Sequence, residues 1–117
     1  MTRDEVMALT DDELRIEAAE LVGWRHSVFG NWPHQMNPPD SDGATVRNCP
    51  DYPNDITPAF ELTQGHDEWW IDTKSHGNEH QCNILRHQGE VYPCWSGIDS
   101  SLARAITRAF VMAMDSE

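Results

Sequence analysis

Residues 68–75 carry the clearest pattern in the chain and read Glu68-Trp69-Trp70-Ile71-Asp72-Thr73-Lys74-Ser75. Side chains alternate along an extended chain, so one side of this stretch carries Trp69, Ile71 and Thr73. The other side carries Glu68, Trp70, Asp72 and Lys74. This period of two predicts a β-strand that buries one of its faces.

Two further strands are predicted directly after this one. Gly77-Asn78 has the composition of a tight turn and leads into a strand near residues 81–87. Gln88-Gly89 offers a second turn into a strand over residues 90–95. The economical topology is therefore a meander of three antiparallel strands.

A helix is predicted on the N-terminal side of this sheet. Thr10 and Glu13 have the spacing of a capping box, which starts a helix at Asp11. The helix stops at Gly23, because glycine readily adopts the left-handed conformation that ends helices. Residues 1–9 are expected to fray.

Two more helices are predicted toward the C-terminus. Asp55 caps a short helix that ends at Gly65. Asp99 or Ser100 caps a final helix, in which an apolar stripe repeats at helical spacing and Arg104 and Arg108 take the opposite, solvated side. That stripe consists of Leu102, Ile106, Ala109, Phe110 and Ala113.

Together these elements predict one α+β domain over residues 1–117. We expect a small antiparallel sheet of three to five strands with the N- and C-terminal helices packed on it, like an α-β-α sandwich. Residues 30–50 are rich in turn formers and predict a long polar loop, with short strands at most near 24–29 and 44–48. The predicted core is Leu14, Leu21, Trp69, Ile71, Ile84, Ile106 and Phe110.

The charge of the chain restricts its partners. The 117 residues hold 20 Asp and Glu against 8 Lys and Arg, a net charge of −12. Such a surface repels phosphate, so it disfavours direct binding to nucleic acid or to an anionic membrane and favours a partner with a basic surface. No stretch has the length of a membrane span or the pattern of a secretory signal, which predicts a cytoplasmic protein.

Five histidine and cysteine residues form the densest group that could bind a metal: His76, His80, Cys82, His87 and Cys94. Zinc takes three or four such ligands. However, His80 and Cys82 share one face of their strand while His87 takes the other. Histidines at loop ends and buried thiols are the alternative interpretation. No catalytic motif accompanies the group, which favours a protein that is not an enzyme.

Two features could form a partner-binding surface. Glu13, Glu17 and Glu20 follow at i, i+4 and i+7, which places a row of carboxylates along the first helix. This row is either a solvated face or a surface that competes for a basic groove. Trp70 lies among charged neighbours, so it either packs beneath a helix or is an exposed binding residue.

Four stretches resemble a family of small phage-encoded proteins, the phage alpha-beta-alpha sandwich domain. They are residues 9–14 leading to 18–24, residues 50–56, residues 60–62 and residues 103–110. In these the chain matches an N-terminal helix that ends in Gly-Trp, an Asp-Tyr-x-x-Asp-Ile helix start, and a terminal helix rich in Ala and Arg. The resemblance implies a phage or prophage gene and carries no established activity.

The leading functional hypothesis is a non-enzymatic phage accessory protein that binds a host protein in the host cytoplasm. An acidic inhibitor of a host defence system, such as a CRISPR effector, fits the small size and the charge. One alternative is a zinc-binding domain with a structural or hydrolytic role that uses the five residues above. Another is a protein that sequesters a small ligand such as a nucleotide, although a single lysine, Lys74, equips the chain poorly for phosphate.

Overall fold

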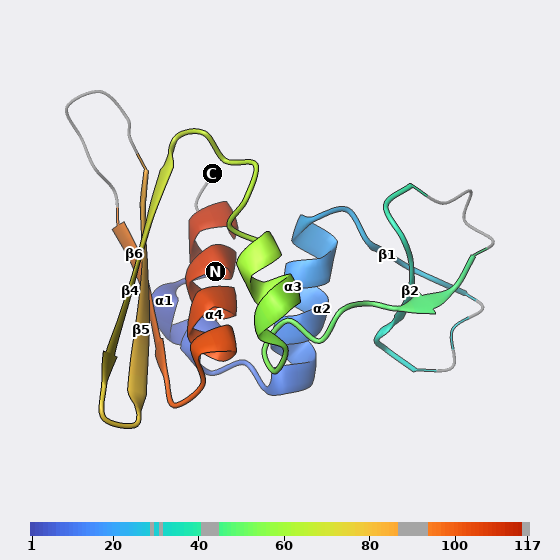
Figure 1. The fold of residues 1–117 in the computed structure, drawn as a ribbon. Coiled ribbons are helices and arrows are strands. Elements are labelled where there is room, and N and C mark those ends of the chain that lie inside the picture. The colour runs from blue at the N-terminus through green and yellow to red at the C-terminus, as the bar shows by residue number, and fades with distance from the viewer. Residues whose placement is uncertain (29, 31, 41–44, 87–93, 116–117) are drawn as a thin grey trace.

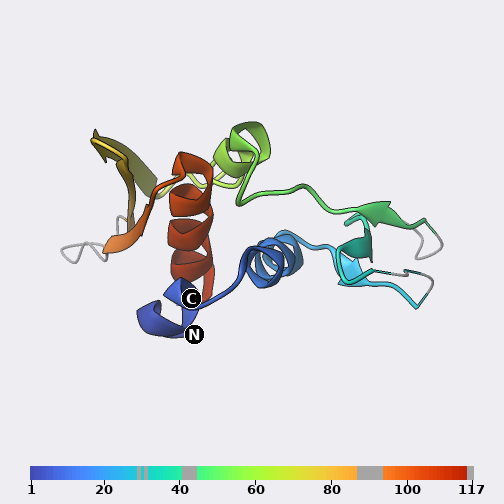
Figure 2. The same cartoon turned by 90° about the horizontal axis from the view of Figure 1, so that it is seen from below.

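The computed structural model describes residues 1–117 except 29, 31, 41–44, 87–93 and 116–117. Helix α4 (Leu102–Asp115) lies at the centre of the molecule, with the main sheet on one side. Helices α2 (Asp11–Leu21) and α3 (Ile56–Glu61) lie on its other side, and a second small sheet projects beyond α2 (Figures 1 and 2). The predicted α+β class is confirmed.

The main sheet is the predicted antiparallel meander. Its strands are β4 (Trp69–His76), β5 (Glu79–Arg86) and β6 (Cys94–Asp99), in the order β4-β5-β6. The third strand was expected over residues 90–95 but extends to Asp99, and residues 87–93 lie outside the described part of the chain. Strand β6 includes Gly97, a buried residue beyond the predicted end of the strand at residue 95.

Gly97 is required because the backbone of α4 packs directly on β6. A Cβ atom at this position would lie 2.1 Å from the backbone oxygen of Ala105 and 2.8 Å from the backbone nitrogen of Ala109. The φ angle of Gly97 lies outside the left-handed region. Glycine is therefore needed here because there is no space for a Cβ atom. The close contact fixes the position of α4 over the sheet.

Helix α4 is buried on most of its circumference, which corrects the prediction of a single apolar stripe. Ala105, Thr107 and Val111 are all fully buried. Arg104 and Arg108 were expected on a solvated side, but their side chains are only 22% and 13% exposed. The reason is that α4 is covered by the sheet on one side and by α2 and α3 on the other.

The predicted caps of α2 and α3 are confirmed. Thr10 Oγ1 accepts from the backbone N–H of Glu13 at 3.2 Å, and Glu13 Oε1 accepts from the backbone N–H of Thr10 at 3.0 Å. Asp55 caps α3 through the N–H of Thr57. The last helix differs, because Ser101 immediately precedes it and Ser101 Oγ accepts from the N–H of Arg104. The cap was expected at Asp99 or Ser100.

Two segments that were predicted to be irregular contain secondary structure. Residues 1–9 hold helix α1 (Arg3–Met7), which has its own capping box between Thr2 and Glu5 and buries Val6 completely. The fraying prediction was therefore wrong. The 30–50 segment contains β2 (Gln35–Asn37), which pairs with β1 (Arg25–His26) and β3 (Arg47–Asn48) in the second sheet. Met36 in β2 is fully buried.

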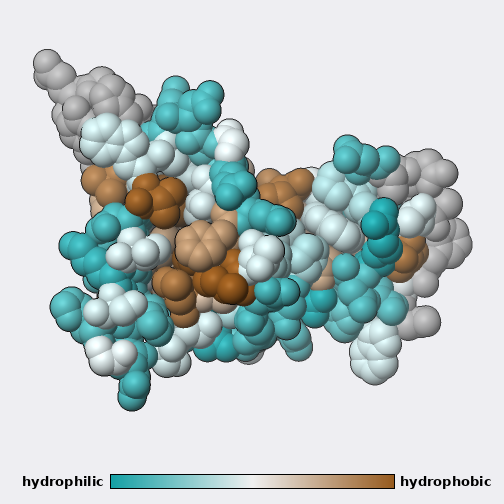
Figure 3. Space-filling model, in the orientation of Figure 1, coloured by the Kyte–Doolittle hydropathy of each residue, from teal (hydrophilic) through white to brown (hydrophobic). Residues whose placement is uncertain are grey.

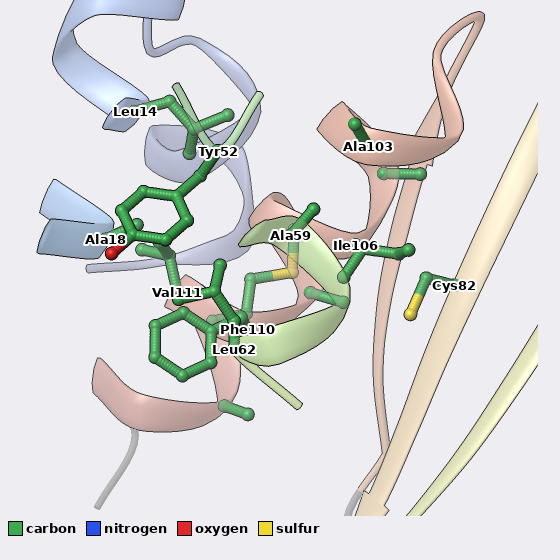
Figure 4. Packing of buried hydrophobic residues seen from close by; sticks show 14 of the residues in the cluster. Leu14, Ala18, Tyr52, Ala59, Leu62, Cys82, Ala103, Ile106, Phe110 and Val111 are labelled. Atoms are coloured by element: carbon green, nitrogen blue, oxygen red, sulfur yellow. The ribbon is translucent and has the colours of Figure 1, made fainter. Parts of the chain in front are cut away.

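The hydrophobic core surrounds α4 on both sides. Figure 4 shows Cys82 of β5 on one side of the helix and Leu14 and Ala18 of α2 on the other. Five of the seven predicted core residues are buried, while Leu21 and Ile71 are partly buried against the same cluster. Among the described residues no helix has both the length and the apolar character needed to cross a bilayer.

Candidate functional site

The outer face of the main sheet points away from α4 and is the clearest candidate binding surface. Trp70 lies on it with 61% of its area exposed. The strand register aligns Trp70 with Leu85 of β5, and Leu85 with Cys94 of β6. The alternative in which a helix covers Trp70 is therefore wrong for the described residues. We define the outer face as Trp70, Asp72, Lys74, Gln81, Asn83, Leu85, Cys94, Ser96 and Ile98.

Hydrogen bonds hold the polar side chains in the middle of this outer face. Gln81 Nε2 donates to Asn83 Oδ1 at 2.8 Å, and Ser96 Oγ donates to the same oxygen at 2.6 Å. Asp72 and Lys74 lie beside them with 3.7 Å between Oδ2 and Nζ. These contacts fix side chains before any partner arrives, which lowers the entropy cost of binding.

A second exposed apolar area lies elsewhere on the molecule. Figure 3 shows hydrophobic side chains gathered over the region of α3 and α4, with hydrophilic residues around them. Helix α3 exposes Ile56 and Phe60 at 39% and 41%. Both are less exposed than Trp70. This area provides a useful control for the outer face.

The exposed charges of the described residues are mostly negative. Four cations are exposed among the described residues: Arg3, Arg25, Arg47 and Lys74. Twelve carboxylates are exposed: Asp4, Glu5, Asp12, Glu13, Glu20, Asp40, Asp55, Glu61, Asp67, Glu68, Asp72 and Glu79. Four arginines are only partly exposed: Arg15, Arg86, Arg104 and Arg108.

Two of these arginines form an ion-pair network at the start of α4. Arg104 donates to both carboxylate oxygens of Asp11 at 2.6 Å and to Asp99 at 2.9 Å. Arg108 Nη1 donates to Asp99 Oδ2 at 2.5 Å. Burial alone would raise the pKa of Asp99, but the N–H of Ser101 and the two guanidinium groups hold that pKa below its usual value.

The ion-pair network ties α2 and β6 to α4. Local sequence patterns could not have revealed it, because Asp11 and Arg104 are separated by 93 positions. A related contact joins α2 to the chain before α3, where Arg15 Nε donates to the carbonyl oxygen of Cys49 at 3.0 Å. These side chains have structural roles.

The predicted carboxylate row on α2 contains three side chains with different roles. Glu13 is part of the helix cap, and the hydrogen bond from Thr10 lowers its pKa. Glu17 is half-buried, so desolvation, followed by the nearby Glu20 and Asp115 charges, raises its pKa. Glu20 Oε1 lies 2.5 Å from His26 Nε2. The row is therefore a weaker candidate for partner binding than the outer face.

The structure separates the described members of the predicted zinc group. Cys82 is fully buried beneath α4, whereas Cys94 is exposed on the outer face. His80 Nδ1 lies 2.7 Å from Ser75 Oγ, and His76 pairs with Glu79 at the end of the hairpin. His87 lies outside the described residues. Within the described ranges no three His, Cys, Asp or Glu side chains converge on a common point.

Cys82 does not have the surroundings of an activated nucleophile. Burial raises the pKa of Cys82 to about 12, so its thiol stays protonated. Cys94 lines a surface hollow of about 390 Å³ together with Arg3, Trp95 and Ser96. Ser96 Oγ lies 3.9 Å from Cys94 Sγ.

A search with models of known protein families found no match to this chain, and searches of curated proteins and of solved structures also found none. The resemblance to the phage sandwich domain therefore stays a prediction.

Proposed function

We propose that this chain is a phage-encoded, non-enzymatic accessory protein that binds a host protein with a basic surface and thereby inhibits a host defence system. The observation that carries the proposal is the outer face of the sheet. It exposes a tryptophan beside ordered polar groups on a molecule whose exposed charges are mostly negative. Tryptophan is the residue type most enriched among binding hot spots.

The exposed carboxylates and the outer face have different roles in binding. The dispersed carboxylates attract a basic partner at long range and raise the association rate. The row of Trp70, Leu85 and Cys94 supplies apolar area at short range and slows dissociation. Binding should therefore weaken only in part as salt rises, because salt screens the charges and leaves the apolar contact intact.

The function is tested by phage infection of hosts that carry defined defence systems, including CRISPR effectors. Expression of the wild-type chain should raise the plating efficiency of a phage that one of these systems restricts. Trp70→Thr should abolish this protection, because it removes the indole and keeps a residue suited to a strand. Phe60→Thr, which changes the exposed area on α3, is the matched control and should leave protection intact.

Binding is measured in parallel with the purified defence protein that gives protection. The wild-type chain should form a complex whose association rate falls as salt rises, and Trp70→Thr should mainly raise the dissociation rate. Failure to protect against every tested system would contradict the inhibitory function. Equal binding by Trp70→Thr and the wild type would contradict the choice of the outer face.

A further inference from the structure

Strand β4 leaves one edge of the main sheet open. In the order β4-β5-β6, β4 pairs with β5 along all eight of its residues, and no described strand pairs with its other edge. The five residues from Asp72 to His76 are all exposed. The opposite edge of the sheet differs, because Met1, Thr2 and Arg3 line a hollow together with the first residues of β6.

The β4–β5 turn determines which backbone groups face the open edge. A two-residue loop, Gly77-Asn78, separates the paired residues His76 and Glu79. Gly77 has a φ of 60° and no described non-glycine residue has a positive φ, which is the pattern of a type II′ turn. In such a hairpin, the pair next to the loop exchanges backbone hydrogen bonds, and hydrogen-bonded pairs then alternate along the ladder.

This alternation gives β4 two sets of backbone groups. Trp70, Asp72, Lys74 and His76 direct their N–H and C=O groups toward β5. Ile71, Thr73 and Ser75 direct theirs toward the open edge. The edge therefore presents three consecutive sets of donors and acceptors at the spacing that another antiparallel strand requires.

The side chains of β4 are complementary to a second copy of the same strand. When two β4 strands run antiparallel with Thr73 opposite Thr73, Asp72 of each copy lies opposite Lys74 of the other. In the same register Ile71 lies opposite Ser75, and Trp70 lies opposite His76. Opposite charges and aromatic residues in directly opposed positions stabilise sheets, whereas like charges in those positions destabilise them.

We propose that two copies of this chain associate through their β4 edges, with Thr73 on the two-fold axis, to form a continuous six-stranded sheet. Two independent features agree on this register. The outward backbone groups are centred on Thr73, and the Asp72 and Lys74 charges are symmetric about it. An interface that is the same patch on both copies closes as a dimer and does not propagate.

The packing of the body leaves room for this association. Helix α4 packs mainly over β5 and β6 and meets β4 at Trp69, so the residues from Asp72 to His76 stay exposed. The repulsion between two acidic chains is screened beyond about 8 Å at physiological ionic strength. At the interface itself, two Asp72 and two Lys74 side chains alternate in sign. The local charges therefore favour the pairing that the net charge opposes.

Sedimentation equilibrium on the full chain tests the proposal, at protein concentrations up to about 300 µM. The wild-type protein should show twice the protomer mass of 13.3 kDa. Thr73→Pro should be a monomer, because proline removes the outward N–H without removing a bond to β5. Thr73→Val keeps the N–H and the shape of the side chain, and it should stay a dimer. Circular dichroism confirms that both variants are folded.

Charge variants test the register. Lys74→Asp places an aspartate opposite each Asp72 and should convert the dimer to a monomer. The double variant Asp72→Lys with Lys74→Asp restores the opposed charges and should restore the dimer. A wild-type protein that is monomeric at every concentration would overturn the proposal. So would a dimer that survives both Thr73→Pro and Lys74→Asp. None of these outcomes depends on a host protein, so they are separate from the test of the proposed function.

Discussion

The two faces of the main sheet are built from the same three strands and differ in what covers them. On the inner face, Trp69, Cys82 and Ile84 are buried against α4. On the outer face, Trp70 is 61% exposed although it is the next residue to the buried Trp69. Two tryptophans with the same strand propensity therefore have different environments, and only their alternation along β4 distinguishes them.

The inner face is a packed surface in which even backbone atoms of α4 and β6 are in contact at Gly97. The outer face contains a hydrogen-bonded set of polar side chains around Asn83. Changes to the inner face should therefore alter stability, and changes to the outer face should alter binding. This difference can be tested residue by residue.

The largest expected effect is on the inner side, at Phe110 of α4. Phe110 is fully buried, and its ring centroid lies 6.1 Å from that of Trp69 with an angle of 64° between the ring planes. Phe110→Ala should lower the free energy of unfolding by about 3–5 kcal/mol, because it removes apolar contacts and leaves a cavity. Urea denaturation measures this loss. An unchanged midpoint would refute the position of Phe110 in the core.

Gly97→Ala should destabilise the protein by about 3 kcal/mol, at the upper end of the range for overpacking. The added methyl group would meet the backbone of α4, which cannot move aside as a flexible side chain can. Gly65→Ala is not a matched control, because Gly65 has a φ of 79°. Ser96→Ala, one residue away on the outer face, is suitable and should cost less. Equal losses of denaturation midpoint in the two variants would refute the close contact of α4 with β6.

Much of the inner face could be predicted from local sequence. The alternation around Trp69 and the apolar spacing around Phe110 gave the correct buried sides, because burial imposes the period of the element on the sequence. The caps of α2 and α3 were also predictable, since a capping box is a local arrangement of hydrogen bonds. Helix α1 was missed although Thr2 and Glu5 have the same spacing as the box at Thr10.

The remaining features depend on contacts between distant parts of the chain. Arg104 and Arg108 were predicted to be solvated because a single apolar stripe indicates a helix with one buried side. In the structure α4 is covered by the sheet on one side and by α2 and α3 on the other. Gly97 lies beyond the predicted end of its strand at residue 95, and the contact that requires a glycine there is with α4, which follows later in the chain. The candidate site was predicted in part. Trp70 was identified as exceptional from its charged neighbours, but the ordered group around Asn83 requires the pairing of β5 with β6.

The ion-pair network at the end of β6 should make the inner side sensitive to acid. Asp99→Asn should cost about 2 kcal/mol at neutral pH, because it removes the charge that Arg104 and Arg108 share. The folded pKa of Asp99 lies below its unfolded value of about 3.9, so its contribution is present above that pH and is lost as the pH falls through the folded pKa.

Urea titrations of the wild type and the Asn variant at several pH values measure this contribution. The difference in unfolding free energy between the two proteins should be constant near neutrality and should shrink below about pH 4. A difference that does not change with pH would mean that Asp99 acts through its shape and not through its charge.

Substitution of the exposed Trp70 should change the stability of the protein least. Trp70→Thr should change the free energy of unfolding by about 0.5 kcal/mol or less, because the side chain is largely exposed and threonine suits a strand. The same substitution at Trp69 should cost several times more, since Trp69 is 8% exposed and stacks on His66 with ring centroids 3.7 Å apart. Thermal melts of the two variants measure this contrast in one experiment. Similar losses of stability in both variants would mean that Trp70 contributes to the core. If Trp70→Thr keeps its stability, any loss of partner binding by this variant can be assigned to the loss of the exposed indole and not to unfolding.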